Sequence, residues 1–208
     1  LGSICTLPLS GFFVNRYGAK KVIYVSGLLM AFALFTISML INVWLTGVML
    51  VIFGGCTITI DVAANVNGIA IERKTGKHLM SSFHGGYSLG TLIGAGTMSV
   101  LFTLGLIPKW ALVICMFVTI IALIFGCRDL LPKDELEADT PIEKPRKGKL
   151  YITPMVVVVG LLCFIMYASE GAVMGWSAIF VSQERGVDVS MAGFFVSVSA
   201  MLVYILVK

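Results

Sequence analysis

Polar side chains that could bind a proton or a solute interrupt an otherwise apolar stretch, residues 54–73. Asp61, Asn65 and Asn67 stand at positions where a membrane-spanning helix normally carries leucine. A carboxylate in the bilayer interior costs about 3 kcal/mol or more unless a partner or water offsets this. A helix would bring five small or polar residues onto one face, namely Gly54, Asp61, Asn65, Gly68 and Glu72. This face is therefore predicted to meet protein or a water-filled cavity, with Asp61 taking up a proton close to Asn65.

Three further residues are candidates for the same chemistry, namely His84, Ser88 and Glu170. If two antiparallel helices flank the basic loop, counting residues outward from it sets His84 level with Asn65 and Ser88 level with Asp61. His84 would then pair with Asp61, relay protons or make only a structural hydrogen bond. Glu170 is a second carboxylate in an apolar segment, where it would titrate or contact the solute.

Simpler roles stay open for the polar residues of residues 54–73. Asp61 could be a structural carboxylate bound to a neighbouring helix, and Asn65 could make only an interhelical hydrogen bond. Glu72, at the end of the stretch, is expected to pair with Arg73, Arg16 or Lys20.

The composition identifies an integral membrane protein, since 58% of the 208 residues are hydrophobic and only 12% are charged. The apolar runs lack the alternation of barrel strands, so the predicted class is an all-α membrane protein. Seven apolar segments are expected to be helical, at residues 1–13, 22–41, 44–71, 79–106, 109–127, 152–182 and 191–207.

The basic residues fix the orientation of these helices. Of 15 Lys and Arg residues, only Lys109 and Arg185 fall in one set of connections, and the others fall in the alternate set. By the positive-inside rule, the loops at residues 14–21, 72–78 and 128–150 are predicted to be cytoplasmic. The expected location is the cell membrane, as a multi-pass protein of a bacterial inner membrane.

The sequence suggests no catalytic site, no metal site and no cofactor. The five cysteines all lie in apolar segments without metal-ligand spacing, so we expect free thiols. The chain opens inside an apolar run without Met, and we expect it to be a fragment of a longer protein. The expected divisions are residues 1–127, a cytoplasmic linker at residues 128–150 and residues 151–208.

The most specific motif lies in residues 11–22, GFFVNRYGAKKV. It resembles the loop between the second and third helices of the major facilitator superfamily, although Asn15 replaces the acidic residue of that pattern. Gly11, Arg16, Gly18, Lys20 and Lys21 match that pattern, and together with Asn15 they form the predicted gating loop. Gly11 is expected to allow close helix approach, Gly18 a tight turn and Asn15 a helix cap. Arg16 and the lysines are expected to pair with acidic groups or helix C-termini of the other half of the fold.

This resemblance implies that the chain supplies helices 2 to 8 of a twelve-helix fold. Residues 128–150 would then join the two halves, and the helices carrying Asp61 and Glu170 would be cavity-lining helices 4 and 7. The run DVAAN at residues 61–65 resembles helix 4 of the fucose-permease-type sugar:proton symporters. In that subgroup the acidic residue is tied to proton coupling and sugar binding.

The expected function is secondary active transport of a small solute, such as a sugar, by alternating access with proton coupling. The expected partners are this small-molecule substrate, protons and the lipid bilayer, with no nucleic acid, and the expected state is monomeric. Drug or metabolite efflux by proton antiport is the alternative. A seven-helix receptor is a more remote alternative, suggested only by the number of apolar segments.

Overall fold

In a computed structural model, residues 2–133, 153–188 and 191 are described, and every regular element among them is an α-helix. The helices are α1 (Gly2–Tyr17), α2 (Ala19–Met39), α3 (Val43–Thr75), α4 (Met80–Thr103), α5 (Pro108–Gly126) and α7 (Pro154–Arg185). Their bounds follow the first six predicted segments within a few residues. The all-α prediction is confirmed. The seventh segment and most of the linker lie outside the described residues.

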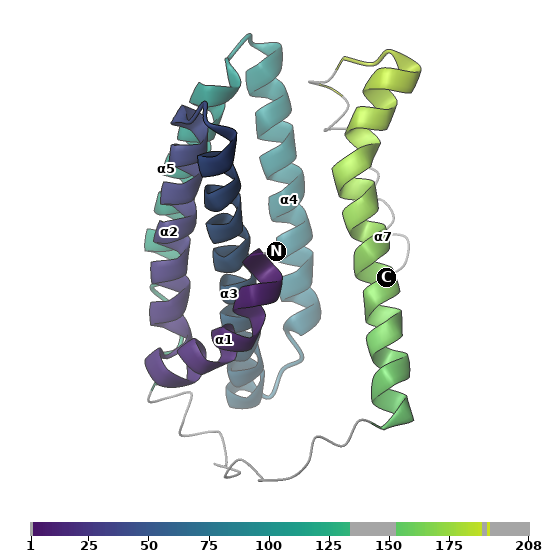
Figure 1. The fold of residues 1–208 in the computed structure, drawn as a ribbon. Helices are drawn as coiled ribbons and strands as arrows, with labels where there is room; N and C mark the ends of the chain where they lie inside the picture. Colours follow the sequence, from purple (N-terminus) through teal and green to yellow (C-terminus); the bar gives the residue numbers. More distant parts are fainter. Residues whose placement is uncertain (1, 134–152, 189–190, 192–208) are drawn as a thin grey trace. The chain divides into compact units, whose positions relative to one another are not determined.

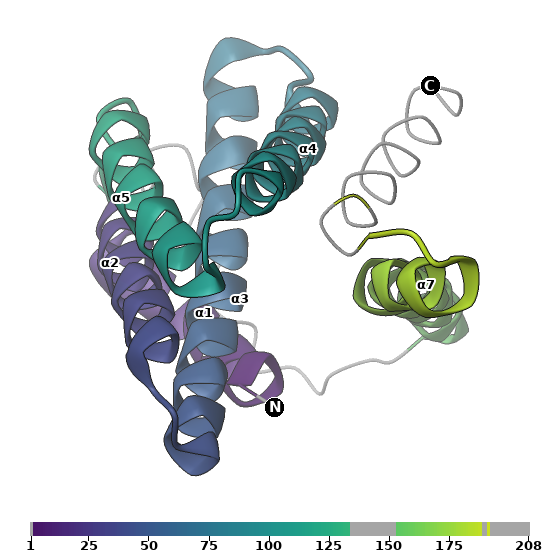
Figure 2. The ribbon, with the colours of Figure 1, turned by 90° about the horizontal axis from the view of Figure 1, so that it is seen from above.

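The chain divides into two compact units. The first contains α1, α2, α3, α5 and the first turn of α4, and the second contains the rest of α4 and α7. In the first unit, α2 packs against both α3 and α5, and α1 packs across α3 (Figures 1 and 2). The first unit therefore positions Asp61, Asn65 and the gating loop, while the second carries Ser88 and Glu170.

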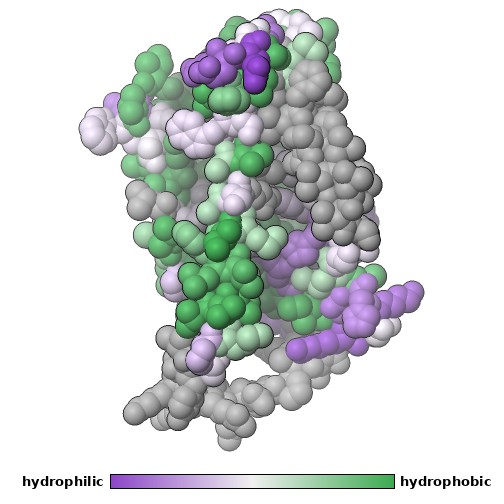
Figure 3. Space-filling view, turned by 90° about the vertical axis from the view of Figure 1, so that its right-hand side faces the viewer, coloured by the Kyte–Doolittle hydropathy of each residue, from purple (hydrophilic) through white to green (hydrophobic). Residues whose placement is uncertain are grey.

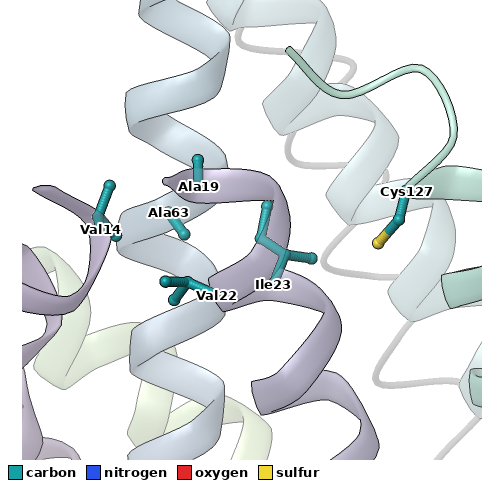
Figure 4. Packing of buried hydrophobic residues seen from close by; sticks show 6 residues of the cluster. All are labelled: Val14, Ala19, Val22, Ile23, Ala63 and Cys127. Carbon is teal, nitrogen blue, oxygen red and sulfur yellow. The ribbon is translucent and has the colours of Figure 1, made fainter. Parts of the chain in front are cut away.

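The buried core of the first unit lies where α1, α2, α3 and the end of α5 meet. It is built from Val14, Ala19, Val22, Ile23, Ala63 and Cys127. Val22 points toward α1 and α3, whereas Ile23 points toward Cys127 after α5 (Figure 4). The small Ala19 and Ala63 are fully buried, which lets the helix backbones approach closely.

Glycines set the close approaches between helices. A Cβ atom on Gly2 would collide with the Val51 carbonyl of α3, and one on Gly55 would lie 2.7 Å from Thr6 Oγ1 of α1. Ser3 Oγ adds a hydrogen bond of 3.0 Å to the carbonyl oxygen of Gly54. A Cβ on Gly11 would meet nothing within 4 Å, so the described residues do not show the close approach predicted there.

Four helices of the described residues, α2, α3, α5 and α7, are long and apolar enough to cross a membrane. The first unit buries few large side chains, and many Leu, Ile, Val and Phe residues are exposed. On the face shown in Figure 3, apolar side chains form a column with strongly hydrophilic ones at its top. Such extensive exposed apolar surface is compatible with lipid or with further membrane helices.

Candidate functional site

Helix α3 has a packed face and an exposed face. Its buried residues recur every three or four positions, as Cys56, Thr59, Ala63, Asn67 and Ala70, and this stripe faces α1 and α2. Asp61 lies off this stripe and is exposed, while Asn65 is partly exposed. The structure thus separates these two residues from the packed side of α3. That this face lines a water-filled cavity or meets further protein stays a prediction.

Asp61 and Asn65 are brought together directly. Asn65 Nδ2 donates a hydrogen bond to the backbone oxygen of Asp61 at 3.0 Å and lies 3.4 Å from its Oδ1. The two residues are one helical turn apart, so helix geometry alone holds the pair. A carboxylate has about four lone-pair sites, so this contact leaves Asp61 able to bind a proton or a solute hydroxyl. The pair offers both donors and acceptors on one side of a spanning helix.

The C-terminal part of the predicted polar face, at Gly68 and Glu72, is covered by the start of α4. Gly68 is buried, and a Cβ there would lie 3.0 Å from Met80 Sδ and 3.2 Å from the Phe83 ring. Gly68 and Glu72 therefore support the hairpin between α3 and α4, and only Asp61 and Asn65 remain as the exposed polar pair of that face.

Glu72 makes a different contact from the cation pairing expected of it. Its Oε1 accepts hydrogen bonds from the backbone N–H groups of Met80 at 2.8 Å and Leu79 at 2.5 Å. These groups open α4, where backbone N–H groups lack helical partners and attract negative charge. The Met80 hydrogen bond lowers the pKa of Glu72, partial burial opposes this, and Leu79 and the charge of His78 add to the lowering.

The gating loop forms a sharp turn at Gly18, as predicted. Gly18 has φ 82° and ψ 149°, a conformation that is essentially restricted to glycine. Helix α2 begins after Gly18 without a side-chain cap, so Asn15 does not cap it as expected. The Arg16 guanidinium lies 5.9 Å from the centre of the Phe12 ring and 5.7 Å from that of Tyr17, in cation–π geometry.

The two lysines of the gating loop differ in their surroundings. Lys20 Nζ donates a hydrogen bond of 2.9 Å to the carbonyl oxygen of Arg128, just after α5, whereas Lys21 is exposed. This partner lies in the same unit as Lys20, so the contact is not the predicted pairing with the other half of the fold.

The remaining candidates are not gathered into one described site. His84 is exposed near the start of α4, and Ser88 follows one turn later but belongs to the second unit. Glu170 lies within α7, and its side chain is outside the described residues. The predicted level relations between His84 and Asn65 and between Ser88 and Asp61 stay predictions. Within the described ranges, no three His, Cys, Asp or Glu side chains converge as metal ligands.

Asn67 is a polar residue whose role the sequence did not reveal. It is 1% exposed, and its Nδ2 donates a hydrogen bond of 3.3 Å to the carbonyl oxygen of Leu131. The available signal was its spacing from Ala63 and Ala70, which places it on the packed face with the small residues.

Comparison with known sequences gives a family match over almost the whole chain. The sequence profile of the Major Facilitator Superfamily matches residues 1–207. An uncharacterized MFS-type transporter of Yersinia pestis is 32% identical over 203 residues, which cover 97% of this chain and 51% of that protein.

Two rhizobial proteins are more distant relatives. The uncharacterized transporter y4wD of Sinorhizobium fredii is 25% identical over 211 residues, covering 100% of this chain and 54% of that protein. The membrane protein MosC of Rhizobium meliloti is 25% identical over 185 residues, covering 86% of this chain and 42% of that protein. The chain thus spans about half the length of the curated relatives it matches. No solved structure matches it.

Proposed function

This chain belongs to the Major Facilitator Superfamily, and from that premise we propose that the whole protein is a proton-coupled secondary active transporter. It moves a small hydroxylated solute, such as a sugar, across the cell membrane by alternating access. Two relatives are named as transporters, which supports the class. The match of DVAAN at residues 61–65 to the fucose-permease-type symporters motivates the sugar.

The observation that carries this proposal is the hydrogen-bonded pair of Asp61 and Asn65 on the exposed side of α3. A carboxylate exists in two protonation states, which offer a solute different hydrogen bonds. When ionised, it only accepts hydrogen bonds, and when protonated, it also donates one. Solute hydroxyls would therefore bind differently to the two states, and such a difference couples proton and solute movement.

The other candidates have subsidiary roles in this proposal. His84 relays protons toward Asp61, and Ser88 and Glu170 contribute solute contacts or a second titrating group. The gating loop from Gly11 to Lys21 controls access from the cytoplasmic side.

The test uses the full-length natural protein in right-side-out membrane vesicles in a lightly buffered medium. Neutral monosaccharides, L-fucose among them, are added one at a time while the external pH and the uptake of radiolabel are recorded. We expect one of them to enter and make the medium more alkaline, since the proton accompanies the sugar. In Asp61→Asn, gradient-driven uptake and alkalinisation are both expected to disappear.

Glu184→Gln is the matched control, because it neutralises an exposed carboxylate in the last turn of α7. Coupled uptake by Asp61→Asn at the wild-type level would refute the role of Asp61. Acidification on adding an amphipathic drug, with no response to any sugar, would replace the symport proposal with proton-driven efflux.

A further inference from the structure

Residues 128–133 form a short segment after α5 that is docked on the first unit of the fold. Two of its backbone carbonyls accept side-chain hydrogen bonds, Arg128 from Lys20 Nζ at 2.9 Å and Leu131 from Asn67 Nδ2 at 3.3 Å. Between them, Leu130 packs against the buried core cluster. The docked segment is thus held from α2, from α3 and from the core.

The far end of the docked segment meets the turn between α1 and α2. A Cβ on Gly18 would lie 2.8 Å from Lys133 Cβ, so the missing side chain makes this approach possible. The glycine of the gating loop therefore serves two purposes, since it also holds the backbone conformation of that turn.

Asn67 is the most buried part of this arrangement. At 1% exposed it is among the largest fully buried side chains, and its Oδ1 accepts no hydrogen bond from the described residues. A buried amide destabilises a fold unless its hydrogen bonds offset the loss of water. Among the described residues, the side chain of Asn67 donates to a backbone carbonyl 64 positions away in the sequence. Asn67 thus combines burial with a long-range hydrogen bond, which indicates a role in holding residues 128–133 rather than in packing alone.

We propose that Asn67 and Lys20 are positioning residues that hold the docked segment, so that the connection to the second half starts from Lys133 rather than from the end of α5 at Gly126. The seven residues from 127 to 133 could span at most about 24 Å if they were extended. When the segment is docked, these residues do not add their extended length to the connection between the two halves. The consequence of docking for transport rests on the proposed function. During alternating access the two halves move relative to each other, and the length of their connection limits this movement.

Cys127 provides a probe of docking that is independent of transport. Its side chain is 6% exposed and packs in the core cluster immediately before the docked segment. Release of the segment therefore uncovers this thiol on the cytoplasmic side. The experiment uses full-length protein in which Cys127 is the single remaining cysteine, in inside-out vesicles treated with a membrane-impermeant maleimide.

We expect Asn67→Ala to accelerate labelling of Cys127 about 2- to 10-fold, the range given by the loss of one ordinary hydrogen bond. Lys20→Met, which keeps an unbranched side chain one atom shorter and lacks the donor, is also expected to accelerate labelling. The acceleration is expected to be smaller, because burial raises the pKa of the Cys127 thiol and the charge of Lys20, which this variant removes, lowers that pKa. Lys20→Arg keeps a donor and is expected to stay slow. Asn65→Ala removes the same side chain two positions away, on the exposed side of α3, and is expected to leave the labelling rate unchanged.

The proposal is overturned if Cys127 reacts at the wild-type rate in both Asn67→Ala and Lys20→Met, or if Asn65→Ala accelerates labelling as much as Asn67→Ala. If Asn67→Ala does not fold, the comparison of Lys20→Met with Lys20→Arg decides by itself. Because labelling does not require substrate, normal coupling in Asp61→Asn would refute the transport role while leaving this result intact.

Discussion

Asn65 Nδ2 lies 3.4 Å from Asp61 Oδ1, one helical turn along the exposed side of α3. The amide also donates to the backbone oxygen of Asp61 at 3.0 Å, which holds it beside the carboxylate. The chemistry proposed for this chain thus depends on two residues whose spacing is set by a single helix and needs no distant contact.

Replacing Asn65 tests whether proton coupling depends on Asp61 alone or on both residues of the pair. Asn65→Ala removes the donor beside the carboxylate but leaves the carboxylate itself, so we expect uptake to fall about 2- to 10-fold while proton coupling persists. The measurement is initial uptake together with external pH in vesicles. Thr75→Ala, at the exposed end of the same helix, is the control. Loss of coupling in Asn65→Ala would show that Asp61 does not suffice as the proton site.

Gly18→Ala tests the turn between α1 and α2. The backbone at φ 82° and ψ 149° excludes a Cβ, and Lys133 crowds the site, so we expect destabilisation of about 1–3 kcal/mol. Gly11→Ala is the matched control in α1, where open space and helical backbone make alanine neutral or stabilising by up to about 1 kcal/mol. Thermal unfolding in detergent measures both. Equal melting temperatures for the two variants would contradict this account.

The contact between α2 and α5 can be tested at Gly27. A Cβ there would collide with the Leu123 methyl groups, so we expect Gly27→Ala to destabilise the protein by about 1–3 kcal/mol. Leu123→Ala opens space on the other side of the contact. The double variant is expected to be more stable than the sum of the single effects predicts, by about 0.5 kcal/mol or more. Additive free energies of unfolding would show that these residues do not meet.

The stabilising role of Glu72 is expected to depend on pH. Its pKa is lower in the folded protein than in the unfolded chain, so its contribution is present above the unfolded pKa of about 4.3 and is lost as pH falls through the folded pKa. Glu72→Ala should therefore lower the melting temperature at pH 7, and its difference from wild type should shrink on acidification.

Two variants control this experiment. Glu72→Gln keeps an amide oxygen that can accept from Met80 and is expected to lose less stability at pH 7. Glu184→Gln changes an exposed carboxylate of α7 and is expected to have no effect. A constant difference between Glu72→Ala and wild type from pH 7 downward would rule out the ionised carboxylate as the cause.

Features that depend on one segment of the chain were predictable from the sequence. Long apolar runs fix the approximate helix bounds, and helical periodicity separates Asp61 from the packed face of α3. The turn at Gly18 was predictable because few other residues adopt its backbone conformation.

Features that depend on distant segments were not predictable in this way. Glu72 could have met any nearby cation, and its partners follow from the path of residues 76–79, which begins with Gly76 at φ 67°. Asn67 binds a backbone carbonyl, which has no sequence signature. Gly11 has the same permissive chemistry as Gly2 and Gly55, and only the crossing point of α1 on α3 decides which glycines are in contact.

The length of α3 has a mechanical consequence. Its 33 residues extend about 50 Å, whereas the hydrocarbon of a bilayer is about 30 Å thick. Asp61 lies 14 residues before the end of the helix at Thr75, about 21 Å along the axis. A rotation of about 10° around the level of Asp61 would displace that end by about 4 Å. In the proposed cycle, a small rearrangement at Asp61 would therefore be converted by α3 into a displacement of its Thr75 end that is large enough to break a hydrogen bond.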